Sequence, residues 1–133
     1  MGGVRLTLRV DFGTDRAIGP GKVLLLEAIR DTGSISQAGR SLGMSYRRAW
    51  LLVDDMNRCF REPVVTAQPG GAQGGGAALT AFGQKVVQKY RKIETEATAA
   101  AKPQLHDLEA SVRSPGRGAG KPRKTSIRAS TAR

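Results

Sequence analysis

The sequence predicts a mainly helical domain with one small β-hairpin. Two observations predict this fold class. Three consecutive segments within residues 20–58 carry apolar residues at helical spacing and begin at residues typical of helix starts. Strand-like segments at residues 64–67 and 77–79 then flank a glycine-rich stretch, and a long amphipathic segment follows them.

A strand and a helix are expected before residue 33. Apolar and polar residues alternate from residue 4 to residue 12, which is the period of a half-buried strand. After the turn-forming residues 13–21, Pro20 is compatible with a first helical turn, and Gly33 marks the end of that helix. The apolar residues of this helix are Val23, Leu24, Leu26, Ala28 and Ile29.

Two further helices follow, joined by a tight turn. Ser34 and Gln37 have the spacing of a capping box, which predicts a short helix over residues 35–42. Gly43 allows a turn with positive φ, and Ser45 can cap the next helix, over residues 46–58. The core stripe predicted for this longer helix is Ala49, Val53, Met56 and Phe60.

The chain continues with the hairpin and a last helix. Thr80 is expected to cap this helix, which runs to about Lys102. Beyond Pro103 there is one weakly amphipathic patch, Leu105, Leu108 and Val112, and residues 114–133 have too little apolar surface to offset the entropy of ordering. We therefore predict a folded domain over residues 1–102 and a basic, disordered tail over residues 103–133.

This order of elements is that of a winged helix-turn-helix, whose second helix fits the major groove of DNA. Arg47 and Arg48 are the predicted main readers, because arginine can donate two hydrogen bonds to guanine, and Leu51 is positioned to contact a thymine methyl group. The other DNA-contact candidates in the motif are Ser34, Ser36, Gln37, Ser45 and Tyr46. An ordinary helical hairpin with solvated arginines remains the alternative.

The glycine-rich stretch PGGAQGGG is interpreted as the tip of the wing. Its main-chain N–H groups allow close approach to the DNA backbone, so its candidate contact residues are Gly70, Gly71, Gln73, Gly74 and Gly75. A plain flexible connector is an equally good interpretation of this composition. A nucleotide phosphate loop is disfavoured, because no Lys-Ser/Thr pair follows the glycines.

The charge points to a polyanionic partner. The formal net charge is +11, and residues 103–133 hold seven basic and two acidic side chains. Lysine and arginine side chains placed against phosphates release counterions and favour binding. The tail is thus either a sequence-independent DNA arm or a terminus without a role.

Enzymatic, metal and cofactor chemistry find little support. His106 is the only histidine, and Asp54 and Asp55 are adjacent on a helix and therefore diverge, so we predict no catalytic residue, no metal site and no cofactor. Cys59 is the only cysteine and is expected to be a small buried hydrophobe rather than a redox switch. Without a signal peptide or an apolar run of membrane-spanning length, the expected location is the cytoplasm, on the nucleoid.

The motifs SISQAG, SYxxAWxxVxxMN and LTxxGQ, together with the glycine wing, resemble the DNA-binding domain of the ModE family of molybdenum-responsive regulators. The resemblance covers about residues 4–95 and is more distant to the LysR-type domain. Tyr46, Ala49 and Trp50 match the family's recognition helix, and we expect Trp50 to pack between helices. No residues match the family's molybdate-binding domains, so oxyanion sensing is not implied.

The resemblance implies a homodimer that binds an inverted repeat and controls genes for molybdenum uptake or molybdoenzymes. The implied dimerisation residues are Phe82, Val86, Val87, Tyr90 and Ile93. Two alternatives remain open: an architectural nucleic-acid binder without an effector, and an interaction module for a separate effector-sensing protein. The operator, the direction of regulation and the signal are not predicted.

Overall fold

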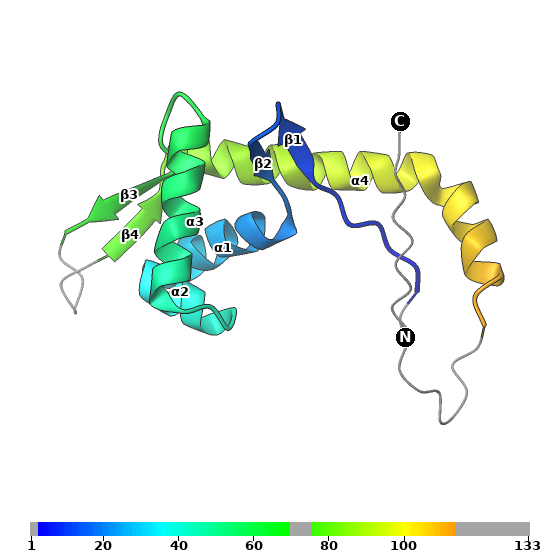
Figure 1. Ribbon diagram of the computed structural model, residues 1–133, viewed down its shortest axis with the longest axis horizontal. Helices are drawn as coiled ribbons and strands as arrows, with labels where there is room; N and C mark the ends of the chain where they lie inside the picture. The colour runs from blue at the N-terminus through cyan, green and yellow to red at the C-terminus, as the bar shows by residue number, and fades with distance from the viewer. Residues whose placement is uncertain (1–2, 70–75, 114–133) are drawn as a thin grey trace.

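A computed structural model describes residues 3–69 and 76–113. Its elements are β1 (Val10–Phe12), β2 (Arg16–Ile18), α1 (Pro20–Thr32), α2 (Ile35–Ser41), α3 (Tyr46–Cys59), β3 (Val65–Gln68), β4 (Gly76–Leu79) and α4 (Ala81–Ala110). Helices α1 to α3 and the hairpin β3–β4 gather at one end of α4, and the second half of α4 extends past them (Figure 1). The mainly helical fold with a wing and a long last helix is confirmed.

The end of α1 and the starts of α3 and α4 form where local signals predicted them. The Ser45 hydroxyl accepts a hydrogen bond of 3.1 Å from the Arg48 N–H at the start of α3. The Thr80 hydroxyl accepts one of 2.8 Å from the Gly83 N–H at the start of α4. Gly33 ends α1 with a φ of 73°, a conformation that glycine adopts without steric cost. Each of these ends depends only on residues close in sequence.

The apolar core lies between α1, α2, α3, the hairpin β3–β4 and the first half of α4. The stripe predicted on α3 is confirmed for Ala49, Val53 and Met56, which are buried. On α1, however, Leu25 is buried while Leu24 is 44% exposed. Leu24 therefore belongs to the surface, although it is one of the apolar residues that predicted this helix.

The strand predicted over residues 4–12 is wrong for most of its length. Only Val10–Phe12 is a strand, and it pairs antiparallel with Arg16–Ile18 in a hairpin that the turn-like composition of residues 13–21 had hidden. The preceding segment lies against α4, where the Tyr90 hydroxyl donates a 2.6 Å hydrogen bond to the Leu8 carbonyl oxygen. A strand needs a neighbouring strand for its backbone hydrogen bonds, and a helix offers none.

Helix α4 is longer than predicted. It continues past Lys102 to Ala110 with Pro103 inside it, so the predicted boundary at residue 102 falls within a helix. The last part of α4 bends away from the direction of the first part (Figure 1). Proline removes one backbone hydrogen bond and its ring clashes with the preceding turn, which bends a helix without having to end it.

An ion pair joins α1 to α4. Arg91 Nε and Nη2 donate hydrogen bonds of 2.9 and 2.7 Å to the two carboxylate oxygens of Glu27. Arg91 Nη1 donates a third, of 2.7 Å, to Glu94. The hydrogen bonds from Arg91 lower the pKa of Glu27 below its ordinary value of 4.5. This two-pronged geometry is the strong form of an arginine–carboxylate pair.

Replacing Arg91 by leucine should therefore lower the free energy of unfolding at neutral pH by about 1 kcal/mol, a figure reduced for solvent screening because the Arg91 side chain is 39% exposed. A lowered carboxylate pKa stabilises the fold above pH 4.5, and this contribution is lost as the pH falls through the folded-state pKa. Urea denaturation at neutral and acidic pH should show the difference between the two proteins narrow in acid. A difference that widens in acid would contradict the assignment.

Lys92 provides the matched control for that substitution. It pairs with Glu96 on the same helix at 3.2 Å, but both side chains are well exposed, at 68% and 65%. Because exposed pairs contribute little to stability, Lys92→Leu should change the unfolding curve much less than Arg91→Leu.

Candidate nucleic-acid interface

Helices α2 and α3 form a tight helix-turn-helix. The Ser34 hydroxyl accepts a 3.0 Å hydrogen bond from the Gln37 N–H and caps α2. The predicted capping box is only half formed, because the Ser34 N–H donates to the Thr32 hydroxyl, 3.2 Å away. A Cβ added to Gly39 would lie 2.8 Å from the Ala49 Cβ, so glycine allows α2 to approach α3 closely. Gly43, with a φ of 75°, makes the turn between them.

Helix α3 presents one face to the core and the opposite face to solvent. Its buried residues, Ala49, Val53 and Met56, define the inner face. With 3.6 residues per turn, the opposite side carries an outward ridge, which we define as Arg47, Leu51, Asp54 and Arg58. Leu51 on this ridge is 54% exposed. A projecting helix face of this kind matches the width of a DNA major groove.

The charged side chains of α3 differ along its length. Asp54 pairs with Arg58 at 3.2 Å, and Asp55 pairs with Lys22 of α1 at 2.9 Å, so the two aspartates diverge as predicted. Within residues 3–69 and 76–113, neither Arg47 nor Arg48 forms an ion pair. The cationic groups at the start of α3 therefore remain available to a ligand.

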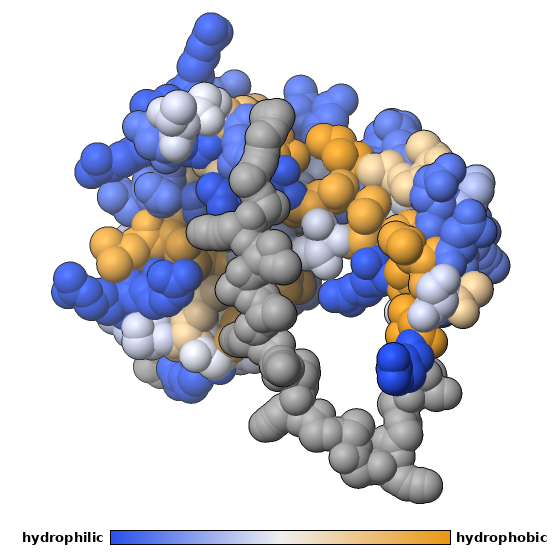
Figure 2. Space-filling model, turned by 45° about the vertical axis from the view of Figure 1, so that its right-hand side comes forward, coloured by the Kyte–Doolittle hydropathy of each residue, from blue (hydrophilic) through white to orange (hydrophobic). Residues whose placement is uncertain are grey.

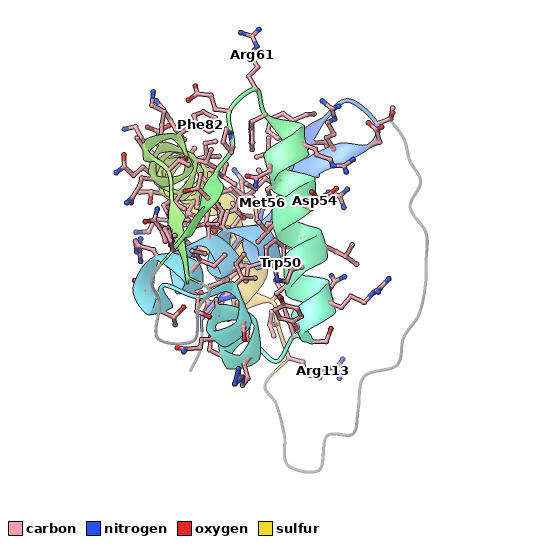
Figure 3. The ribbon with its side chains drawn as sticks, turned by 90° about the vertical axis from the view of Figure 1, so that its left-hand side faces the viewer. Trp50, Asp54, Met56, Arg61, Phe82 and Arg113 are labelled. Atoms are coloured by element: carbon pink, nitrogen blue, oxygen red, sulfur yellow. The ribbon has the colours of Figure 1, made fainter. Side chains whose placement is uncertain are left out.

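The expectation that Trp50 packs between helices is wrong. Its side chain is 44% exposed, and its ring meets the ring of Tyr46, itself 61% exposed, edge to face with centroids 6.2 Å apart. Trp50 lies on the side of α3 that faces the hairpin β3–β4, away from Asp54 (Figure 3), and Tyr46 lines the same space between α3 and the hairpin. Cys59, expected to be buried, is half-buried at the end of the same helix.

Asn57 ties the end of α3 to the base of the wing. Its Oδ1 accepts hydrogen bonds of 2.7 Å from the Val64 N–H and 3.2 Å from the Val65 N–H. Its Nδ2 donates a third, of 3.2 Å, to the Val65 carbonyl oxygen. The sequence carried no signal for this role, because an asparagine within a helix has no characteristic spacing to the backbone groups that it contacts.

The wing itself is the antiparallel pair β3–β4, in which Val65 lies opposite Leu79 and Gln68 opposite Gly76. The Ala77 N–H donates a 2.9 Å hydrogen bond to the Gly33 carbonyl oxygen, which holds the wing against the end of α1. The predicted tip contacts lie outside the residues that the structure describes; they are Gly70, Gly71, Gln73, Gly74 and Gly75.

A groove of about 400 Å³ runs between α3 and the wing. Its residues come from α2, α3 and both strands of the wing, and include Ser34, Ser36, Tyr46, Trp50, Thr66 and Ala77. Two other residues were predicted from the sequence to contact DNA. Gln37 lies exposed on α2, and the Ser45 hydroxyl caps α3. The fold thus brings the serines of α2 and the first turn of α3 to one face.

Comparison with known proteins identifies the relatives of this chain. It is 42% identical over 92 residues to the molybdenum transport protein ModE of Azotobacter vinelandii, which covers 69% of this chain and 33% of that protein. It is 51% identical over 81 residues to the molybdenum-pterin-binding protein MopB of Rhodobacter capsulatus, covering 61% and 30%. The DNA-binding transcriptional dual regulator ModE of Escherichia coli K12 is 41% identical over 71 residues, covering 53% and 27%. No protein-family model matches the chain.

This chain is homologous to the N-terminal region of the ModE regulators. It spans about a third of the length of these relatives. The family resemblance noted on the helix-turn-helix motifs is therefore confirmed, for that region alone. The ModE relative of Escherichia coli K12 is named as a transcriptional regulator and not as an enzyme, which agrees with the expectation that this chain has no catalytic role.

The dimerisation residues implied by the ModE resemblance do not form a free surface. Val86, Val87 and Tyr90 are buried in the core of their own chain. The Phe82 ring packs edge to face against the Phe60 ring, with centroids 5.3 Å apart. Of the five residues, only Ile93 is well exposed, with 42% of its surface accessible. The face of α4 that carried the helical stripe thus has its partner within the same chain.

A different apolar surface lies along the second half of α4. There the N-terminal segment, α1 and α4 surround an open groove of about 1000 Å³, whose apolar members include Val4, Leu6, Leu24 and Leu105. Figure 2 shows apolar side chains gathered along this side of α4. In this ModE-like domain, the part of the long helix beyond the core carries apolar surface that the other described residues leave uncovered.

Across residues 3–69 and 76–113, no group of three histidine, cysteine or acidic side chains is placed to hold a metal ion. In the same part of the chain, no helix has the length and apolar character to cross a bilayer.

Proposed function

We propose that this chain is a sequence-specific duplex-DNA-binding regulator that acts as a homodimer on an inverted repeat in the cytoplasm. The main observation in support of this proposal is the exposed start of α3, where Arg47 and Arg48 have no ion-pair partner among residues 3–69 and 76–113. Genes for molybdenum uptake or molybdoenzymes are the proposed targets, since the relatives carry names that refer to molybdenum.

The turn between α2 and α3 supports this proposal. Gly39 and Gly43 fix the approach of the two helices, and Ser45 caps α3, so the arginines are presented from a rigid element. Rigid presentation favours specificity, because little side-chain and backbone entropy is lost on binding. The net charge of +11 adds attraction to any duplex, which aids encounter but carries no sequence information.

Selection from a random-sequence duplex library, followed by footprinting of the enriched sequence, tests the proposal. The expected result is an inverted repeat whose half-sites lie about one helical turn, or roughly 34 Å, apart. Equal affinity for every duplex would contradict it and would favour an architectural binder.

Arg47→Ala should lower the preference for the selected duplex over a scrambled one by about 10- to 100-fold, because a two-pronged arginine–guanine contact discriminates against other bases. Competition binding at fixed salt measures this ratio. Arg9→Ala is the matched control: Arg9 pairs with Asp11 at the hairpin β1–β2, which meets α3 at the end opposite Arg47, and its loss should leave the ratio unchanged. An unchanged ratio for Arg47→Ala would remove Arg47 from the reading residues.

For the homodimer, we place the interface on the second half of α4 with the N-terminal segment and Leu24, because the earlier part of α4 is buried in its own chain. Sedimentation should show a dimer, and Leu24→Glu should yield folded monomer, since Leu24 is 44% exposed within one chain. Leu51→Glu, at an exposed leucine on another face, should remain dimeric. A dimer that survives Leu24→Glu would contradict this placement.

A further inference from the structure

The groove between α3 and the wing lies beside the residues that we propose to read the bases. We propose that it seats one sugar–phosphate strand of the duplex, and that Tyr46 and Trp50 bind this strand independently of sequence. The inference rests on the proposed function, because it takes the outward ridge of α3 to lie in the major groove.

The exposed aromatic pair is the first observation. Tyr46 and Trp50 are one helical turn apart, and their rings pack edge to face on each other at 6.2 Å with 61% and 44% exposure. A tyrosine and a tryptophan that remain this exposed present apolar surface that water solvates poorly. Such surface indicates a ligand with apolar parts at this position.

The groove walls are the second observation. Its floor is apolar, formed in part by Val53 and Val65, while its edge carries the hydroxyls of Ser34, Ser36 and Thr66. None of the described residues that line it is acidic. Arg40 donates a 3.3 Å hydrogen bond to the Ser36 hydroxyl, which brings a guanidinium group to the rim. The apolar floor of the groove suits a deoxyribose ring, and the hydroxyl groups at its edge with the guanidinium group at its rim suit the flanking phosphates.

The direction in which these groups face distinguishes the strand from the bases. Arg47 and Leu51 lie opposite the buried face of α3. Tyr46 and Trp50 lie about a quarter turn around the helix from these two residues, on the side toward the wing. With the ridge in the major groove, the side toward the wing faces the strand that borders that groove. The wing then lies across this strand, so the strand passes between α3 and β3–β4.

Trp50 is the only tryptophan, and its emission therefore reports on this groove alone. The full chain is titrated with the selected duplex and with a scrambled duplex of equal length. We expect the emission to change with both. Trp50→Ala should weaken binding of both duplexes by the same factor, about tenfold, because the lost contact is apolar surface rather than base readout.

Three companion variants sharpen the test. Tyr46→Ala should repeat the uniform loss, and Trp50→Phe, which keeps an aromatic ring, should recover most of the affinity. Arg40→Ala should lower the slope of log affinity against log salt by about one, whereas Trp50→Ala should leave that slope unchanged. Circular dichroism checks that each variant is folded, which is expected since Tyr46 and Trp50 are exposed.

Two outcomes would overturn the inference. If Trp50→Ala weakens only the selected duplex, Trp50 reads bases. If the wild-type emission does not change on titration and the variants keep the wild-type affinity, while the wild type still prefers the selected duplex, the strand lies elsewhere and the proposed function stands. Failure of the proposed function looks different: the wild type then shows no preference, yet a uniform loss in Trp50→Ala would still support the strand groove.

Discussion

Replacing Gly83 by alanine is expected to lower the free energy of unfolding by about 3 kcal/mol or more. Gly83 is buried in the first turn of α4, beneath the residue that leads into the wing. A Cβ there would overlap the Val64 carbonyl oxygen and lie 3.0 Å from the Val64 carbonyl carbon. Both are backbone atoms, so the clash cannot be relieved by a change of rotamer.

The same backbone is held from other directions, which prevents it from moving aside. The Val64 carbonyl oxygen accepts a 3.0 Å hydrogen bond from the Thr80 N–H, and the Thr80 hydroxyl donates one of 2.8 Å to the Pro63 carbonyl oxygen. Any shift that makes room for a methyl group breaks these bonds. The cost therefore includes both overlap and lost hydrogen bonds.

Chemical denaturation followed by circular dichroism measures this effect. Gly21→Ala is the matched control, because Gly21 is also helical but a Cβ added to it meets nothing within 4 Å. That substitution should leave the stability unchanged or raise it slightly, since alanine favours the helix. Equal stability of the two variants would show that α4 is not packed on Val64 as described.

Asn57→Ala should lower the free energy of unfolding by about 2 kcal/mol. It removes both contacts of Oδ1 and the one made by Nδ2. Val64 is 0% exposed, so its N–H loses its partner at 2.7 Å with no water to replace it. A buried donor left without an acceptor costs its full desolvation energy.

The substitution should also weaken DNA binding beyond its effect on stability, because it frees the wing from α3. Asn57→Asp keeps an acceptor for the Val64 N–H and should recover part of the loss, which denaturation and duplex-binding measurements can compare. Asp54→Ala, which removes an exposed pair on the same helix, should change stability little. If Asn57→Ala were as mild as Asp54→Ala, the hydrogen bonds to the wing would not hold it in place.

The elements predicted well are those whose ends depend on near neighbours. Ser45 and Thr80 cap their helices through the N–H three residues on, and Gly33 and Gly43 supply positive φ where a chain reversal requires it. These interactions are local, so the order and type of most helices followed from the residues alone.

The predictions were wrong where contacts with a segment distant in the sequence determine the local structure. Residues 4–9 alternate like a strand but meet α4 instead of a second strand, with Tyr90 bound to Leu8. Pro103 was taken to end the last helix, yet α4 continues through it to Ala110. Neither the neighbour of an extended segment nor the tolerance of a helix for proline is encoded within a short window.

For the candidate site, the sequence alone determined which side chains of α3 face outward. The apolar stripe of α3 marks its buried face and so assigns Arg47, Arg48 and Leu51 to the outside. Only the tertiary structure decided which way the remaining faces point. Trp50 and the stripe of Val86, Val87 and Tyr90 are all apolar surface, but the wing leaves Trp50 open while α1 and the N-terminal segment cover the stripe. Periodicity shows that a face is apolar, and only the packing of distant segments determines whether its own chain or another molecule covers it.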